Sequence, residues 1–261
     1  FNEPACFIGN GYITGEHAPF EKRLDDLNAI PEVVALLSKH VLLAHGKAVQ
    51  LIRKHAILTP KVGLALNGTL IEPKDNTEES LQAAKDKMFS DFGLFGTFSW
   101  WADPIILGRI PDPMKSIFNE DEISIVNQSI DFLGYNCYST SNYDEWMPDS
   151  DPGYPGMPRT AMGWAITPNA LYWAMKFFYE RYNLPLMITE NGMTNIDFVT
   201  MDGKVQDPQR IDFLKRYLKG LHQAIEEGVP VLGYLYWSIL DNFEWAEGYE
   251  PRFGLVYVDY Q

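Results

Sequence analysis

An acidic residue closes an apolar segment in the second half of the chain. The run 184–188 (LPLMI) is too short for a helix, continues into Thr189-Glu190 and meets turn residues at Asn191-Gly192. It predicts a buried strand of a parallel sheet that ends in a carboxylate. Because burying an ionised group without partners is costly, function explains Glu190 better than packing does. A salt-bridged acid at a strand end is the structural alternative.

A second acid has a similar setting at the start of the chain. Glu3 precedes Pro4, which cannot donate a backbone hydrogen bond to a sheet and which restricts the residue before it to extended geometry. Glu3 is therefore expected where a strand ends and a loop begins. An acid before proline is common, so the tetrapeptide 1–4 is a weak signal by itself.

Three segments together make the signal specific. They are Asn2-Glu3-Pro4, residues 188–192 (ITENG) and residues 237–245 (WSILDNFEW). Their combination resembles glycoside hydrolase family 1, the β-glucosidase and β-galactosidase family, and the resemblance covers the chain from its first residue to its last. It implies a retaining β-glycosidase. The spacing of the cysteines and histidines implies no cofactor or metal. The resemblance also implies β-D-glucosides, or related neutral β-hexosides, as small-molecule substrates.

The resemblance assigns different roles to the two acids. Glu3 would be the acid/base, and Glu190 the nucleophile that forms a covalent glycosyl-enzyme intermediate. Retention requires two carboxyl groups about 5 Å apart on opposite sides of the anomeric carbon. In a parallel barrel the ends of strands four and seven can face each other across the mouth, so the long separation in sequence is no obstacle.

Further residues match sugar-binding positions of the family. Asn2 resembles the asparagine that contacts the sugar 2-hydroxyl, and Asn136 and Tyr138 in 134–138 (GYNCY) match a pair on the sixth strand. There the tyrosine donates a hydrogen bond that favours the charged nucleophile. Cys137 departs from the aromatic residue of many relatives, and its side chain is expected to point away from the mouth. A turn-capping asparagine and a buried structural tyrosine are the alternatives.

The segment near the C-terminus adds three residues. Trp237 resembles the tryptophan on whose ring the sugar stacks, while Glu244 and Trp245 resemble the pair that binds the O3, O4 and O6 hydroxyls. The Glu-Trp pair favours a neutral hexoside over a 6-phosphorylated one. Core aromatics and a surface acid are the structural alternatives.

The elements that must position these residues alternate along the chain. Apolar runs at 61–67, 130–136, 184–190 and 231–238 predict strands. Spacings of three and four, together with capping signals, predict the helices between them. The predicted helices are residues 31–55, one capped by Asn76, one that begins at Thr167-Pro168, and one from Asp207-Pro208 to Gly228.

Apolar periodicity also predicts which helix faces are buried. For 31–55 the stripe is Val34, Leu37, Val41, Leu42, Ala44, Ala48 and Leu51. For the helix after Thr167 it is Leu171, Ala174, Phe177 and Phe178. For the last helix it is Ile211, Leu214, Leu218, Leu221 and Ile225.

Alternating strands and helices predict an α/β fold with a parallel sheet, and functional residues at strand ends indicate a (β/α)8 TIM barrel. A doubly wound sheet would usually carry a Gly-x-Gly-x-x-Gly loop, which this chain lacks. The patterns give four complete strands and the end of a fifth at Glu3, whereas the barrel needs eight. Residues 1–261 are therefore expected to be a single domain, the C-terminal half of a barrel from the end of strand four through strand eight.

A half barrel would expose two edge strands and part of its core. The expected partner is the missing N-terminal half with strands one to four, or a second copy through self-association.

Two other hypotheses remain besides an active glycosidase. A catalytically silent sugar-binding or interaction protein of the same fold would typically have lost one acid, and both are present. A fragment without the first half would be inactive by itself.

The composition excludes several classes of protein. A net charge of −14 over 261 residues argues against nucleic-acid binding, and no apolar run approaches the roughly 18 residues of a membrane span. A soluble protein is expected, with the cytoplasm the favoured compartment although no residue settles it. Cys6 and Cys137 are expected to be buried free thiols, and His40 and His45 ordinary helix residues, since neither set has metal-ligand spacing.

Two aromatic loops, 95–127 and 143–163, are expected to carry aglycone preference, and little regular structure is expected in the first. Four tryptophans in or directly beside them either line the entrance of the site or pack beneath it. They are Trp100, Trp101, Trp146 and Trp164.

Overall fold

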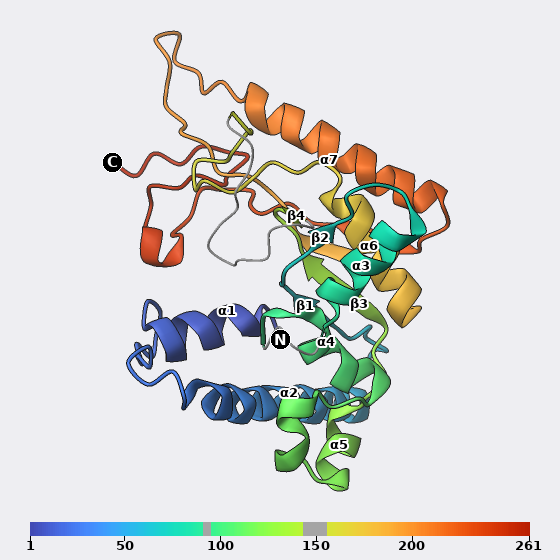
Figure 1. The fold of residues 1–261 in the computed structure, drawn as a ribbon. Coiled ribbons are helices and arrows are strands. Elements are labelled where there is room, and N and C mark those ends of the chain that lie inside the picture. Colours follow the sequence, from blue (N-terminus) through green and yellow to red (C-terminus); the bar gives the residue numbers. More distant parts are fainter. Residues whose placement is uncertain (91–94, 143–155) are drawn as a thin grey trace.

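The structure, a computed structural model, describes residues 1–90, 95–142 and 156–261. Its centre is a four-stranded parallel sheet in the order β1-β3-β5-β6 (Figure 1). The strands are β1 (Gly63–Leu66), β3 (Phe132–Asn136), β5 (Leu186–Glu190) and β6 (Val231–Tyr234). Each lies inside one of the four apolar runs, so the predicted strands are confirmed.

The first residues of the chain extend this sheet. Asn2 forms a parallel bridge with Ala65 of β1, the Glu3 amide donates to the Ala65 carbonyl (3.0 Å), and the Ala65 amide donates to the Phe1 carbonyl (3.2 Å). The expectation that a strand ends at Glu3 is thus confirmed, but Glu3 itself has a left-handed backbone (φ 42°, ψ 59°) and not the extended geometry expected before Pro4. The strands of the sheet follow one another in chain order without a reversal. A doubly wound sheet reverses at its switch point, so the order is that of a barrel.

A smaller sheet and the helices complete the architecture. β2 (Ile71–Glu72) and β4 (Ser141–Asn142) pair in parallel in the loops that follow β1 and β3. The long helices are α2 (Ile30–His55), α3 (Glu78–Met88), α6 (Ala170–Tyr182) and α7 (Pro208–Glu226). The short ones are α1 (Pro4–Ile8), η1 (Gly9–Thr14), α4 (Phe98–Ala102), η3 (Asp103–Leu107), η4 (Asp112–Ile117), α5 (Glu120–Val126) and η5 (Trp245–Glu247). Figure 1 shows α2 and α5 below the sheet, α7 above it, and long loops gathered on the left.

Two helix starts differ from the predicted ones. The cap of α3 is Thr77 and not Asn76, because the Thr77 hydroxyl accepts the Ser80 amide at 3.3 Å. α6 begins at Ala170, three residues after Thr167, whose hydroxyl accepts the backbone amide of Thr140 (2.9 Å) instead of capping the helix. In both cases the side chain expected to cap the helix does not do so.

The loop 95–127 contains more regular structure than the sequence analysis predicts. It holds α4, η3, η4 and α5, and the last of these begins with a complete capping box in which Asn119 and Glu122 exchange side-chain to backbone bonds. That Asn-x-x-Glu spacing is the signal which could have revealed α5.

Trp100 and Trp101 belong to the core of this region. They are 1% and 0% exposed, and their indole N–H groups donate to the Ser38 hydroxyl (2.8 Å) and the Phe95 carbonyl (2.7 Å). They therefore pack beneath the site and do not line its entrance. Trp146 lies outside the described residues.

The buried face of a helix is determined here by polar contacts as well as by its apolar side chains. In α6 the predicted Leu171, Ala174, Phe177 and Phe178 are all buried. In α7 the predicted face is only partly right. Leu221 is buried and Leu214 partly buried, as expected, but Ile211, Leu218 and Ile225 are 39–53% exposed, and Phe213 and Tyr217 are buried in their place. Tyr217 explains the rotation, since its hydroxyl accepts the Thr167 amide (2.8 Å) and donates to the Tyr138 carbonyl (3.1 Å).

The same holds for α2, where the predicted stripe is only partly buried. Val34 and Leu42 are buried, whereas Ala44, Ala48 and Leu51 are exposed. The buried face instead includes Gly46, which faces the backbone of α5, and Ser38, the partner of Trp100.

The sheet is open within the described part of the chain. β6 pairs with β5 alone, and Leu232 and Leu235 on and beside it are 47% and 50% exposed. The fold is that of part of a TIM barrel, as predicted. Across the three described ranges, no helix has the length and apolarity needed to cross a bilayer.

Close packing between α2 and α5 leads to a stability prediction. A Cβ atom at Gly46 would lie 1.9 Å from the Ile125 carbonyl oxygen. Alanine is the better helix former by about 1 kcal/mol, so a Gly→Ala change in an open helix should stabilise it. Here the clash reverses the sign, and Gly46→Ala should lower the free energy of unfolding by about 1–3 kcal/mol in urea titrations.

The neighbouring exposed residue supplies a matched control. Lys47→Ala should change the free energy of unfolding by less than about 0.5 kcal/mol. A stabilising effect of Gly46→Ala would show that α2 and α5 do not approach as described.

Candidate active site

The predicted site residues meet where the parallel strands end. Glu3 follows the segment paired with β1, Asn136 is the last residue of β3, and Glu190 is the last residue of β5. Asn136 and Glu190 are register partners across the sheet. The fold therefore brings side chains from positions 3, 136 and 190 to one edge, which is where active sites of parallel barrels lie.

Asn136 connects the first acid to the sheet. Its side-chain Nδ2 donates to Glu3 Oε1 (2.9 Å) and to Asn2 Oδ1 (3.0 Å), and its Oδ1 accepts the Thr189 hydroxyl at 2.6 Å. The threonine bond fixes the orientation of the amide, so that N–H groups and not the carbonyl face the acid. Thr189 was not singled out by the sequence analysis, although it adjoins Glu190. Asn2 itself is exposed.

Tyr138 holds the second acid. Its hydroxyl donates to Glu190 Oε2 at 2.7 Å, and its ring packs against Trp164 and Phe253, with centroids 5.2 and 5.9 Å away. The ring contacts fix the hydroxyl in place. Trp164, half-buried, thus supports the site from beneath through Tyr138. Cys137, between these two strand-end residues, is fully buried in the core and points away from them as predicted.

The two acids influence each other electrostatically. Burial raises the pKa of Glu190 to about 7, the Tyr138 hydrogen bond acts against that rise, and the negative charge of Glu3 adds to it. Burial and the charge of Glu3 also raise the pKa of Glu244. Burial, followed by the charge and hydrogen bond of Glu190, raises the pKa of Tyr138, so this hydroxyl remains a donor over the whole working range of pH. Three half-buried carboxyl groups therefore share one region in which not all of them are readily ionised together.

The strand-end segment after Glu190 fixes the next loop. Asn191 donates to the Cys137 carbonyl (2.6 Å) and accepts the Tyr234 hydroxyl (2.8 Å), and its own carbonyl accepts the Trp237 amide (2.9 Å). A Cβ on Gly192 would lie 2.0 Å from the Trp237 carbonyl oxygen. Trp237 is thereby held against the segment that carries the nucleophile candidate. From the sequence alone, Asn191 is expected only to be a turn residue.

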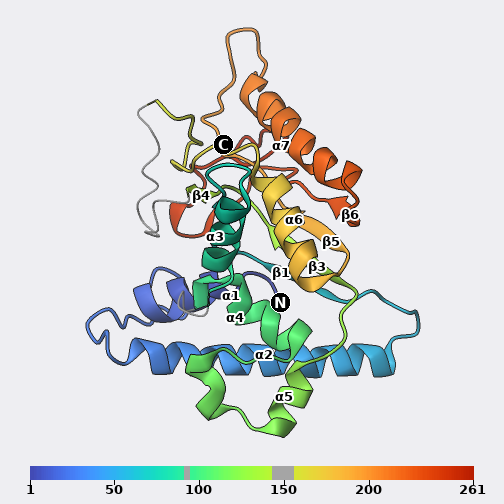
Figure 2. The same cartoon turned by 45° about the vertical axis from the view of Figure 1, so that its right-hand side comes forward.

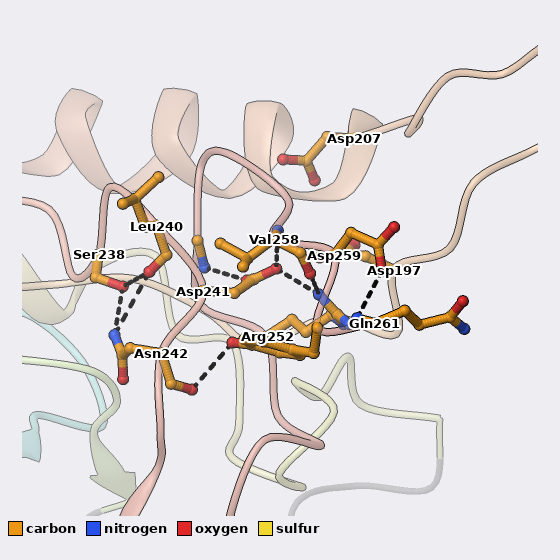
Figure 3. Close-up of polar contacts among 12 residues, drawn as sticks. Asp197, Asp207, Ser238, Leu240, Asp241, Asn242, Arg252, Val258, Asp259 and Gln261 are labelled. Carbon is orange, nitrogen blue, oxygen red and sulfur yellow. Dashed lines mark hydrogen bonds and ion pairs between the residues drawn. The ribbon is translucent and has the colours of Figure 1, made fainter.

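A buried carboxylate organises the loop that follows Trp237 (Figure 3). The Asp241 carboxylate is 5% exposed. It accepts hydrogen bonds from Arg252 Nη1 (2.6 Å) and from the backbone amides of Gly254 (2.9 Å) and Val258 (3.1 Å). Ser238 donates to the Leu240 carbonyl at 2.7 Å within the same turn. Residues 252–258 are therefore joined by hydrogen bonds to the loop that leads to Glu244.

Glu244 and Trp245 differ in how closely they approach the carboxylates. Glu244 is half-buried and close enough to raise the pKa of Glu190. Trp245 is 65% exposed, and its ring stacks on His17. The described contacts thus bring Glu244 to the acid pair and place Trp245 at the rim.

The free thiols and His45 make contacts with neighbouring protein side chains. Cys137 is buried as expected, but Cys6 is only half-buried. The Sγ atom of Cys6 accepts a hydrogen bond from Asn67 Nδ2 (2.9 Å) and contacts Glu3 at the edge of the site. Burial lowers the pKa of His45 to about 4, so it stays neutral against the Phe1 ring. No group of three or more potential metal ligands occurs in the described ranges.

The chain belongs to glycosyl hydrolase family 1. The family model matches residues 1–261, which is the whole sequence. This agrees with the partial TIM barrel and with two acids at strand ends.

Named relatives agree with this membership. The chain is 38% identical over 277 aligned positions to a 1,4-beta-D-glucan glucohydrolase of Thermotoga neapolitana, covering 99% of this chain and 60% of that protein. It is also 38% identical to beta-glucosidase A of Thermotoga maritima, of which it covers 58%. The structure of a Thermotoga maritima beta-glucosidase in complex with deoxynojirimycin superposes with a TM-score of 0.80 at 37% identity, over 99% of this chain and 58% of that one. The chain thus spans about 60% of the length of these relatives.

The Tyr138 bond predicts a measurable change in the pKa of Glu190. Tyr138→Phe removes a hydrogen bond that favours the charged carboxylate, so the pKa of Glu190 should rise above about 7. Loss of one such bond corresponds to about a tenfold tighter hold on the proton. The measurement is a carbon-13 NMR titration of the Glu190 carboxyl. Tyr172→Phe, whose hydroxyl contacts Glu227 on the surface, is the control and should leave the Glu190 midpoint unchanged.

Proposed function

We propose that this chain carries the acid/base, the nucleophile and most of the glycone-binding residues of a retaining β-glycosidase that acts on β-D-glucosides. The supporting observation is the common support of the two acids. Glu3 bonds to Asn136 and Glu190 bonds to Tyr138, and both partners come from the end of β3 and the residues just after it. One rigid segment therefore orients both carboxyl groups toward the same edge of the sheet.

The proposed reaction is a double displacement. A carboxylate oxygen of Glu190 attacks the anomeric carbon while Glu3 donates its proton to the leaving glycosidic oxygen, which departs as an alcohol. Glu3, now ionised, takes a proton from water, and the resulting hydroxide displaces Glu190 from the glycosyl ester. The second step returns the proton to Glu3 and the carboxylate to Glu190, so the site is restored.

The Tyr138 hydrogen bond supports the role of Glu190. Burial, and to a smaller extent the charge of Glu3, raise the pKa of Glu190 to about 7, which opposes its ionisation. The Tyr138 hydroxyl acts against that rise, because it donates to the charged carboxylate at 2.7 Å. This hydrogen bond therefore favours the ionised form that the nucleophile needs for the first step.

The remaining residues are assigned to the sugar. Asn2, exposed beside Glu3, binds the 2-hydroxyl. Trp237 offers its ring to the apolar face of the sugar, Glu244 accepts bonds from O4 and O6, and the Trp245 indole donates to O3. This assignment rests on family membership and on the position of these residues around the acid pair. The glucoside preference rests on the activities for which the relatives are named.

The proposed active form includes a further polypeptide segment. The chain spans about 58% of the Thermotoga maritima enzyme, and β6 has an unpaired edge in the described part of the chain. Leu232 and Leu235 beside that edge, and Ile211 and Ile225 on α7, are exposed apolar side chains. A segment that supplies the other strands of the barrel would cover them, with self-association as the competing outcome.

Hydrolysis of 4-nitrophenyl β-D-glucoside tests the proposal. The rate is measured for this chain alone and after addition of an N-terminal half taken from a family 1 β-glucosidase. We expect hydrolysis in the mixture, and Glu190→Gln should reduce it by a factor of at least about 10³, because the covalent step loses its nucleophile. Glu247→Gln, an exposed acid of the same loop, is the matched control.

The two acids are distinguished by the leaving group. With 2,4-dinitrophenyl β-D-glucoside, which departs without protonation, Glu3→Gln should still show a burst of dinitrophenol while Glu190→Gln should not. Absence of hydrolysis in both preparations would contradict an active enzyme, and a full rate for Glu190→Gln would contradict the assigned roles.

A further inference from the structure

Two distant parts of the chain meet through a pair of stacked rings. The His17 imidazole lies on the Trp245 indole, with centroids 5.2 Å apart and planes inclined by 17°. His17 follows η1, in the segment that begins with Glu3, and Trp245 opens η5, directly after Glu244. Figures 1 and 2 both show the red turn of η5 opposite the blue helical segment of the N-terminus.

The backbone around His17 is well anchored. Its amide donates to the Asn10 carbonyl (3.0 Å) and its carbonyl accepts the Phe20 amide (2.8 Å). One turn further on, the Glu21 amide donates to the Gly11 carbonyl at 2.9 Å. The half-buried imidazole is therefore presented from a loop with several backbone bonds to η1.

Trp245 has less support of its own. It has a positive φ of 43° and is 65% exposed, in a turn closed by the Glu244 amide and the Gly248 carbonyl at 2.6 Å. Among the ring pairs of the described residues, His17 is the aromatic partner of this indole. Without the imidazole, nothing among those ring pairs would restrain the plane of the indole.

We propose that His17 is a positioning residue for Trp245. The imidazole covers one face of the indole and fixes its plane, so that the ring meets the sugar through its N–H edge and not through the covered face. This rests on the proposed function, in which the indole donates to a sugar hydroxyl. The stack also ties the loop that carries the glycone residue Glu244 to the segment that carries Glu3. His17 thus contributes to ground-state binding of the sugar without touching the reacting atoms.

The ring arrangement is tested without any need for turnover. The chain is labelled with 5-fluorotryptophan, and the fluorine-19 NMR resonance of Trp245 is identified by its loss in Trp245→Phe. We expect His17→Ala to shift and broaden that resonance, because the stacked ring is lost, and His17→Phe to keep it sharp. His222→Ala, an exposed histidine of α7, is the control and should leave it unchanged. A Trp245 resonance unaffected by His17→Ala overturns the proposal.

The functional role is tested in the hydrolysis assay described above. His17→Ala should raise KM for the glucoside about three- to tenfold, the size expected for one aromatic contact, with kcat changed less than about twofold. His17→Phe should restore KM, and His222→Ala should match the parent protein. Equal KM values for parent and His17→Ala, or no rescue by phenylalanine, would contradict a positioning role. A preparation without turnover contradicts the proposed function and the role in KM, while the NMR experiment still decides the stack.

Discussion

The hydrogen bond from Asn136 to Glu3 is the interaction on which the arrangement of the site depends. Glu3 belongs to a segment that pairs with β1 only through a short bridge, and beyond its contact with the Cys6 thiol its carboxyl group needs a partner to hold its orientation. The amide at the end of β3 supplies that partner, and the Thr189 hydroxyl on β5 sets which way the amide faces. The N-terminal segment, β3 and β5 are thus joined through one side chain, directly beside the second acid.

Burial of the acid pair makes ionisation of Glu190 unfavourable and makes the hydrogen bond from Tyr138 important. A carboxylate taken out of water is destabilised, and a like charge nearby adds to the effect, which is why Glu190 binds a proton more tightly than an ordinary glutamate. The hydroxyl of Tyr138 offsets part of this. Its ring is fixed by Trp164 and Phe253, so the orientation of the hydroxyl needs no adjustment when charge develops on the acid.

The sequence was sufficient for the four strands of the main sheet and for the residues at their ends, but not for the short strands β2 and β4. Short apolar runs closed by polar residues leave few alternatives, so β1, β3, β5 and β6 fall where expected. Helix faces were harder, because Tyr217 and Ser38 turn toward partners that lie far away in the sequence. No periodicity within a single helix contains that information.

The residues of the site also divide into those that the local sequence identifies and those that only the three-dimensional arrangement reveals. Glu3, Asn136, Tyr138 and Glu190 could be chosen from local patterns and family resemblance. The roles of Thr189 and Asn191 depend on which strand lies beside which, and so does the contact between His17 and Trp245. Cys6 illustrates the point, since a thiol expected in the core instead lies half-exposed against Asn67 and Glu3.

The sequential strand order has a consequence for how the chain can be built. Each strand of the main sheet after β1 pairs with the strand of that sheet that comes immediately before it along the chain. During synthesis on the ribosome, each newly emerging strand therefore finds its neighbour already made and exposed as a template. Growth of the sheet then proceeds in one direction, from β1 toward β6.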